Sequence, residues 1–131
     1  MVFLEGINDI GQGNRAGIPD TDRVSADDVI AGVKQLIDKA HSHGIQVLGG
    51  TLTAIEGSAY YNDNAEAVRQ TVNQWIRTSG SFDAIVDFDA TTRDASAPRK
   101  FRAEFDSGDH LHPNDAGYKA MAEAIDLDFF K

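Results

Sequence analysis

Short apolar runs alternate with longer amphipathic stretches along this 131-residue chain, and this alternation constrains the fold more than any other feature. The apolar runs are typical of buried strands and lie at Val2–Leu4, Ile45–Leu48 and Ile85–Phe88. The stretches between them carry apolar residues at the three- and four-residue spacing of helices. Strands that alternate with helices favour βαβ units, a parallel sheet and right-handed crossovers. We therefore predict one α/β domain over residues 1–131.

Local signals predict where the helices begin and end. Ser25 and Asp28 resemble a capping box at the start of the first helix, and Gly44 suits the left-handed conformation that follows a helix end. The second helix is expected to open at Asp63 and Glu66 and to close at Gly80, and the last to begin at Asn114 or Asp115. Their predicted apolar faces are Val29, Ile30, Val33, Leu36, Ile37 and Ala40; Ala65, Val68, Val72, Trp75 and Ile76; and Ala120, Met121, Ala124 and Ile125.

The charge balance narrows the classes of partner. The chain has 21 acidic and 12 basic side chains, a formal net charge of −9, which disfavours nucleic acid and anionic membrane surfaces. No apolar run approaches the roughly 20 residues of a membrane span. Because Met1 is followed at once by a predicted strand, we expect no signal peptide on these residues. Without cysteine, the chain offers no disulfide framework and no thiolate metal site. The sequence does not indicate the compartment.

Asp109 and His112 form the candidate catalytic pair. A general base in acyl transfer needs an imidazole whose second nitrogen is held by a carboxylate, because that contact fixes the tautomer and stabilises the imidazolium. A three-residue spacing within one loop can bring both groups together without help from another element. Taken alone, this spacing favours a solvated loop histidine beside an aspartate, which is common in any acidic protein.

Gly6 and Asn8 follow the first predicted strand. Gly6 permits a tight exit from the strand, and the side-chain amide of Asn8 is suited to an oxyanion, a contact worth roughly 3–4 kcal/mol in the transition state. The alternative for Asn8 and Asp9 is a simple turn or helix cap. Because parallel sheets place ligands at the carboxyl ends of their strands, Asn8, the Gly49–Thr53 turn and the Asp109–His112 loop are expected at one edge.

Two longer strings carry a family resemblance. Leu4–Ile10 (LEGINDI) and Asp106–Tyr118 (DSGDHLHPNDAGY) resemble the G-x-N-D and D-x-x-H blocks of the SGNH (GDSL) serine esterases. Gly49–Thr53 is similar to the segment after that family's fourth strand, with Ala54 where many members carry proline. The resemblance implies a flavodoxin-like three-layer α/β/α sandwich with five parallel strands in the order 2-1-3-4-5. This chain would hold only strands three, four and five of that partial sandwich.

The resemblance also implies roles and an omission. Asp109 would orient His112 as general base, and Asn8 with Gly6 would form the oxyanion site for an ester substrate, with no cofactor. The Gly-Asp-Ser block that bears the family's nucleophile is absent, together with its strand, a partner strand and a loop glycine. The serines of this chain fall at helix ends or in loops: Ser25, Ser42, Ser58, Ser79, Ser81, Ser96 and Ser107. We expect the C-terminal part of a serine ester hydrolase, for carboxylesters or carbohydrate acyl esters, that is weak or inactive alone.

Loss of a central strand has a physical consequence for Val2–Leu4. One edge of this strand is left with unpaired backbone donors and acceptors, and such an edge invites pairing with another chain. We therefore expect a homo-oligomer, or a complex with a complementing N-terminal fragment, through this first strand. The family resemblance is compatible with secretion.

Two other functions remain open at this point. One is a non-catalytic assembly or binding fragment that retains half of the hydrolase fold. The other is a metal-dependent hydrolase that uses Asp106, Asp109, His110 and His112, because imidazoles and carboxylates are good ligands, although we expect no metal. His41 and His43 form a second histidine pair, but the end of a helix accounts for them. Tyr60 and Tyr61 are compatible with a sugar platform, whereas Trp75 is expected in the core.

Overall fold

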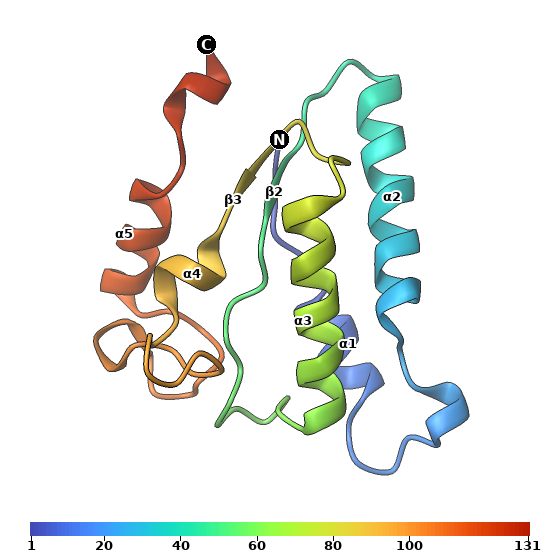
Figure 1. Cartoon of the computed structure of the whole chain (residues 1–131), viewed down its shortest axis with the longest axis vertical. Coiled ribbons are helices and arrows are strands. Elements are labelled where there is room, and N and C mark those ends of the chain that lie inside the picture. The colour runs from blue at the N-terminus through green and yellow to red at the C-terminus, as the bar shows by residue number, and fades with distance from the viewer.

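The computed structural model describes residues 1–131, and its strands and helices alternate along the chain (Figure 1). The strands are β1 (Val2–Phe3), β2 (Leu48–Gly50) and β3 (Ala84–Val86), and the helices are α1 (Ile7–Gly13), α2 (Ala26–Ser42), α3 (Asp63–Thr78), α4 (Phe88–Thr92) and α5 (Asp115–Glu123). Short 3-10 helices lie at Asp20–Asp22, Ala103–Phe105 and Leu127–Phe130. The three strands are parallel and lie in the order β1-β2-β3. The predicted α/β class with a parallel sheet is confirmed.

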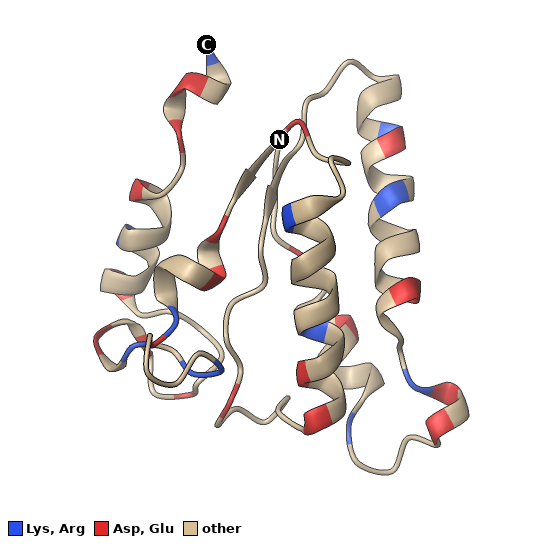
Figure 2. Cartoon of the chain, viewed as in Figure 1, with Lys and Arg blue, Asp and Glu red and all other residues tan.

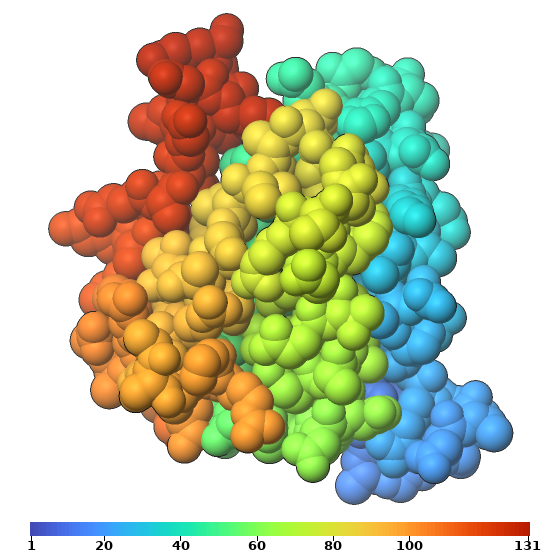
Figure 3. Space-filling model, viewed as in Figure 1, coloured from blue at the N-terminus to red at the C-terminus, as the bar shows by residue number.

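Helices cover the sheet on both faces. On one face α2 and α3 lie side by side (Figures 1 and 3). Successive side chains of a strand point to opposite faces, so Val47 joins the core under these helices while Leu48 faces the other way. There Leu48 packs with Val86, Phe88 and Met121 of α5. The result is a partial three-layer α/β/α sandwich.

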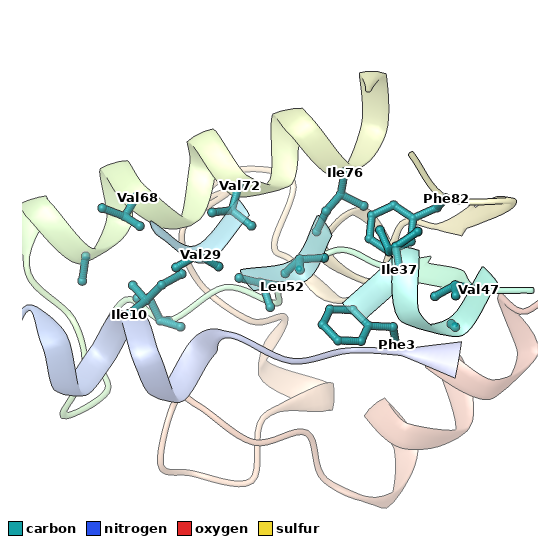
Figure 4. Packing of buried hydrophobic residues seen from close by; sticks show 14 residues of the cluster. Phe3, Ile10, Val29, Ile37, Val47, Leu52, Val68, Val72, Ile76 and Phe82 are labelled. Atoms are coloured by element: carbon teal, nitrogen blue, oxygen red, sulfur yellow. The ribbon is translucent and has the colours of Figure 1, made fainter. Parts of the chain in front are cut away.

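The larger core lies between the sheet and the pair of helices α2 and α3 (Figure 4). Its labelled members are Phe3, Ile10, Val29, Ile37, Val47, Leu52, Val68, Val72, Ile76 and Phe82. The ring of Trp75 packs against this core with its centroid 5.6 Å from that of Phe82, as expected for a core residue. Leu36, which was placed on the buried stripe of α2, is instead 44% exposed and lines a groove beside β1.

The predicted helix ends are largely confirmed. Ser25 and Asp28 form the capping box of α2, and Gly44 has the left-handed φ of 69° expected after a helix. The last helix begins at Asp115, with the side chain of Asn114 accepting the amide of Gly117 at 3.0 Å. This helix ends at Glu123, so the predicted continuation of its apolar face to residues 124 and 125 lies beyond it.

The strand bounds differ from the prediction. Gly49 and Gly50 extend β2 beyond the predicted end at Leu48, because Gly49 pairs with Phe3 and Ile85 and Gly50 pairs with Val86. The rings of Phe82 and Phe88 fill the space that a Cβ at these positions would occupy. Ile45 lies outside the strand and is exposed. Phe88 begins α4 instead of extending β3, because the Asp87 side chain before it accepts a helix amide and caps α4.

A buried ion-pair network anchors the segment that follows β2. Arg69 and Asp89 are both fully buried, and the Arg69 guanidinium donates to Asp89 at 2.8 Å and to Glu66 at 2.7 and 2.8 Å. The same guanidinium donates to the backbone carbonyl of Leu52 at 2.9 Å. Asn73 holds this residue as well, accepting its amide at 2.7 Å and donating to its carbonyl at 2.8 Å. The network therefore fixes the chain that leads to the carboxyl-end loops.

Two more arginines complete the network around α4. Asp89 also accepts hydrogen bonds from Arg77 at 2.9 Å and from Arg93 at 2.7 Å. Arg77 reaches back to Asp87 at 2.8 and 2.9 Å, and the Thr51 hydroxyl donates to Asp87 at 2.8 Å. The network thus contains three arginines and three carboxylates, those of Glu66, Asp87 and Asp89, so its charges balance. This balance lowers the energetic cost of burying Asp89.

The Asp87 carboxylate makes stability sensitive to acid. Burial alone would raise its pKa, but hydrogen bonds from Arg77, the Ala90 amide and Thr51 outweigh burial and lower the pKa from 3.8 to about 2. At acidic pH the native state therefore binds fewer protons than the unfolded state. The stabilisation from Asp87 is fully present above pH 3.8 and is lost as the pH falls through about 2. We expect the free energy of unfolding to depend less steeply on pH between 2 and 4 in Asp87→Asn than in the parent, measured by urea titration.

The control for this pH experiment is Asp38→Asn, which removes an exposed carboxylate of α2. This variant is expected to keep the parent's acid dependence. Equal slopes in the parent and in Asp87→Asn would contradict the assignment of this acid sensitivity to Asp87.

The strand β1 lies at the edge of the sheet, with nothing paired on its outer side. Met1, Val2 and Leu4 are 44%, 42% and 37% exposed, respectively. Beside this edge a groove of about 360 Å³ runs between β1 and α2, with Phe3, Val33 and Leu36 among its apolar walls. Acidic residues are spread over most helices and loops instead of gathering on one element (Figure 2). None of the helices has the length and apolar character required to cross a bilayer.

Candidate active site

The loop before α5 brings Asp109 and His112 together. An isolated antiparallel bridge between Asp106 and Pro113 closes the base of this loop. Within it, Asp109 Oδ2 lies 2.6 Å from His112 Nδ1, and Asp109 Oδ1 accepts the backbone amides of Leu111 at 2.9 Å and His112 at 2.8 Å. The local geometry therefore orients the imidazole with Nδ1 on the carboxylate and Nε2 directed away from it.

The surroundings of Asp109 favour its ionised form. Hydrogen bonds from the His112 ring and amide, from the Leu111 amide and from the Ser107 hydroxyl hold the pKa of the Asp109 carboxyl well below its usual range. An ionised carboxylate on Nδ1 leaves Nε2 of His112 as the basic nitrogen. The side chains of His112 and Asp109 are 63% and 51% exposed, so in this chain the pair lies at the surface.

Gly6 and Asn8 lie where β1 leads into α1. Gly6 has a φ of 115°, which other residues adopt only with strain, and a Cβ at this position would lie 3.3 Å from the side chain of Val29. The tight exit expected of Gly6 is therefore present. Asn8 lies exposed in the first turn of α1, a short helix where the sequence had suggested only a turn or cap, and its Oδ1 accepts the hydroxyl of Tyr60 at 3.0 Å.

The loop over residues 56–61 contacts Asn8 and the ring of His110. At one end Gly57, with a φ of 103°, packs so close to the His110 ring that a Cβ would lie 3.0 Å from it. Three residues later, Tyr60 binds Asn8. No hydrogen bond joins Asn8 directly to Asp109 or His112, and this loop contacts His110, which lies between those two residues in the sequence. α1, this loop and the Asp109–His112 loop all lie at the carboxyl end of the sheet (Figure 1), whereas Gly49 and Gly50 of the Gly49–Thr53 segment expected there lie within β2.

A second carboxylate–imidazole pair stands beside the first. Asp106 Oδ2 contacts His110 Nδ1, and Asp106 Oδ1 accepts the amides of Gly108 at 2.8 Å and His110 at 3.1 Å. His110 is the one residue other than glycine with a positive φ, 59°. Sequence reasoning considered His110 only as a metal ligand and missed this pairing.

The side chains proposed for a metal site do not converge. No group of three or more histidine, aspartate or glutamate side chains is placed to hold a metal ion. Asp106, Asp109, His110 and His112 instead form two separate pairs. His41 is likewise engaged elsewhere, 2.9 Å from Asp83. The geometry therefore gives the metal-dependent alternative no support.

Tyr60, Gln12 and Gly57 are site neighbours that sequence reasoning did not assign. Tyr60 was considered only as part of a sugar platform, yet its hydroxyl binds Asn8 and also accepts Gln12 Nε2 at 3.2 Å. Tyr61 is partly buried against the larger core, which accounts for it without a sugar. The four-residue spacing of Asn8 and Gln12 on a helix was the only signal available for this cluster.

Comparison with known proteins identifies the fold and the family. The model of the GDSL-like lipase/acylhydrolase family matches residues 1–120. A GDSL-like lipase from Bacteroides thetaiotaomicron is structurally similar, with a TM-score of 0.71 and 18% identity over 94% of this chain and 58% of that one. An acetylxylan esterase from Geobacillus stearothermophilus has a TM-score of 0.66 and 18% identity, over 94% of this chain and 55% of that one. No curated protein matches this chain at a significant level.

The chain thus spans a little under three fifths of the length of these structures, and its likeness to them shows the fold. The family match covers nearly the whole chain, including both Asn8 and the Asp109–His112 loop. This chain therefore belongs to the GDSL-like lipase/acylhydrolase family.

Proposed function

We propose that this chain supplies the general base, its orienting carboxylate and the anion-stabilising amide of an ester hydrolase whose nucleophilic serine lies on another segment. The observation that carries the proposal is the 2.6 Å contact between Asp109 and His112 Nδ1, which leaves His112 Nε2 without a protein partner. An imidazole held in this way is suited to take a proton from a serine hydroxyl.

The reaction follows from these roles. The serine oxygen attacks the ester carbonyl while His112 Nε2 takes its proton, and the Asn8 amide donates to the oxygen that becomes negative. As the carbon–oxygen bond to the alcohol breaks, the leaving alkoxide takes the proton from His112. Water then attacks the acyl-enzyme with His112 again as base, which releases the acid and restores the serine. Asp109 stays ionised throughout, consistent with its lowered pKa.

The contacts of the chain's own serines support a nucleophile from elsewhere. Ser107 is nearest in sequence to the pair, but its hydroxyl donates to Asp109 at 3.0 Å and not to His112. Ser25 is engaged as the cap of α2. No serine hydroxyl is hydrogen-bonded to the His112 ring. The exposure of this pair also argues for a covering segment, because charge stabilisation is strongest where water is excluded.

The unpaired edge of β1 offers the place for that segment. Its exposed apolar residues and the adjoining groove are suited to a parallel strand and the helix that follows it. A second copy of the chain could use the same edge, and we propose that the isolated chain associates through it. The substrate class we propose is a carboxylester or a carbohydrate acyl ester, the latter supported by the acetylxylan esterase among the similar structures.

A fusion protein tests this function. A designed segment bearing a strand, Gly-Asp-Ser and a helix is joined ahead of Met1, and hydrolysis of p-nitrophenyl acetate and labelling by a serine-directed phosphonate are measured. We expect both in the fusion and neither in the fusion whose grafted serine is changed to alanine. A burst of labelling at one serine in the isolated chain would refute the proposal. A folded fusion without hydrolysis would favour the non-catalytic assembly alternative.

A further inference from the structure

Asn8 stands at the end of a directed series of hydrogen bonds. Arg15 Nη1 contacts Gln12 Oε1 at 3.5 Å, Gln12 Nε2 donates to the Tyr60 hydroxyl at 3.2 Å, and Tyr60 donates to Asn8 Oδ1 at 3.0 Å. Three of these residues come from α1 or the two residues that follow it, and the fourth comes from the 56–61 loop.

The direction of this series is set at its arginine end. A guanidinium can only donate, so Arg15 holds the oxygen of the Gln12 amide and turns its NH₂ group toward Tyr60. The Tyr60 oxygen then accepts from Gln12, and its single proton is left for Asn8 Oδ1. With its oxygen occupied in this way, Asn8 presents Nδ2 as its free group.

Packing of the Tyr60 ring against α1 holds its hydroxyl beside Asn8 and Gln12. The Tyr60 ring lies against Gly11, where any Cβ would overlap the ring atoms. Residues 8, 11 and 12 of α1 follow the three- and four-residue spacing that places side chains on one face of a helix. One face of α1 therefore carries the Asn8 amide, the space for the Tyr60 ring at Gly11 and the glutamine, and Arg15 follows just beyond the end of the helix.

We infer that Tyr60, Gln12 and Arg15 are positioning residues that orient the Asn8 amide so that Nδ2 faces the reacting oxygen. The inference rests on the proposed role of Asn8 as oxyanion donor. It explains how the protein selects the orientation of the Asn8 amide. An asparagine free to turn over would present its carbonyl oxygen part of the time, and that oxygen would repel a developing negative charge.

The test is the variant Gln12→Glu, which reverses the direction of the hydrogen bond between Tyr60 and residue 12. A carboxylate at position 12 accepts from both Arg15 and the Tyr60 hydroxyl, so the Tyr60 oxygen becomes an acceptor for Asn8 Nδ2. In the isolated, isotope-labelled chain we expect solvent exchange of the Asn8 Nδ2 protons to slow by about two- to tenfold. Nuclear Overhauser contacts from these protons to the Tyr60 ring are expected to strengthen.

Tyr60→Phe provides a second, independent variant because it keeps the ring over Gly11 and removes only the hydroxyl. Here we expect the order parameter of the Asn8 side-chain amide to fall, since its oxygen loses its partner. Gln35→Glu on the exposed face of α2 and Tyr118→Phe on α5 are the matched controls and are expected to leave the Asn8 signals unchanged.

Asn8 signals in Gln12→Glu and Tyr60→Phe that match those of the two controls would overturn the inference. This outcome is distinct from failure of the proposed function, because the amide is observed in the isolated chain. An inactive fusion protein with an oriented Asn8 amide would contradict the esterase proposal and leave the positioning series supported.

Discussion

Asp89→Asn is expected to lower the free energy of unfolding by about 3–5 kcal/mol, the range found when one partner of a buried ion pair is removed. The Asp89 carboxylate is fully buried and accepts hydrogen bonds from Arg69, Arg77 and Arg93. An asparagine removes the negative charge that these arginines share and places an NH₂ donor against their donors. Arg69, also fully buried, is left with less compensation for its charge. Urea unfolding followed by circular dichroism measures the loss.

The matched control for Asp89→Asn is Asp38→Asn on the exposed side of α2, which is expected to change stability by less than about 0.5 kcal/mol. A double-mutant cycle with Arg69→Met separates the pair from its surroundings. Because each single variant leaves the charge of the other member of this pair without its partner, and the double variant leaves neither, the double variant is expected to be less destabilised than the sum of the two single variants. Additive losses would contradict the coupling that the network implies.

His112→Ala in the active fusion protein is expected to lower kcat by roughly 10⁴-fold or more, because the serine loses its base and the leaving alkoxide loses its acid. Asp109→Asn is expected to reduce kcat by about 10⁴-fold, because an amide cannot hold the imidazole in the reactive tautomer. Asn8→Ala is expected to cost about 10²–10³-fold in kcat with little change in KM, since its contact forms only in the transition state. Steady-state hydrolysis of p-nitrophenyl acetate measures all three.

His43→Ala is the control for these active-site variants. His43 is an exposed histidine at the C-terminal end of α2, away from the carboxyl-end loops, and its loss is expected to leave kcat unchanged. If His112→Ala and His43→Ala retained the same activity, the assignment of the base to His112 would be wrong. Unfolding midpoints of each variant separate loss of catalysis from loss of structure.

Several features of the fold could be predicted because their causes are local. The capping box of Ser25 and Asp28 and the glycine at 44 involve residues within one helical turn, so the sequence places the ends of α2 directly. The same holds for Asp109 and His112, whose contact closes within a three-residue loop segment. Alternation of strands and helices also predicted the parallel sheet correctly.

The strand bounds could not be predicted because they depend on distant side chains. Gly49 and Gly50 look like strand breakers by local rules, yet they lie in β2 because they pair with β1 and β3, and aromatic rings of Phe82 and Phe88 fill the space that larger residues would need. Phe88 continues an apolar run in the sequence, but Asp87 caps a helix there, so β3 ends at Val86. In both places tertiary packing outweighs local propensity.

The sequence by itself determined the alternation of three strands with α2, α3 and α5, the ends of α2 and the pairing of Asp109 with His112, since these depend on spacing along the chain. Only the tertiary structure decided that Arg69 meets Asp89, twenty residues away, and that Tyr60 meets Asn8, fifty-two residues away. Such contacts have no local signature, because they form only when packing of the core brings α1, α3, α4 and the carboxyl-end loops together. The proposed acid–base pair is therefore local in origin, whereas the orientation of the proposed oxyanion donor is a product of the fold.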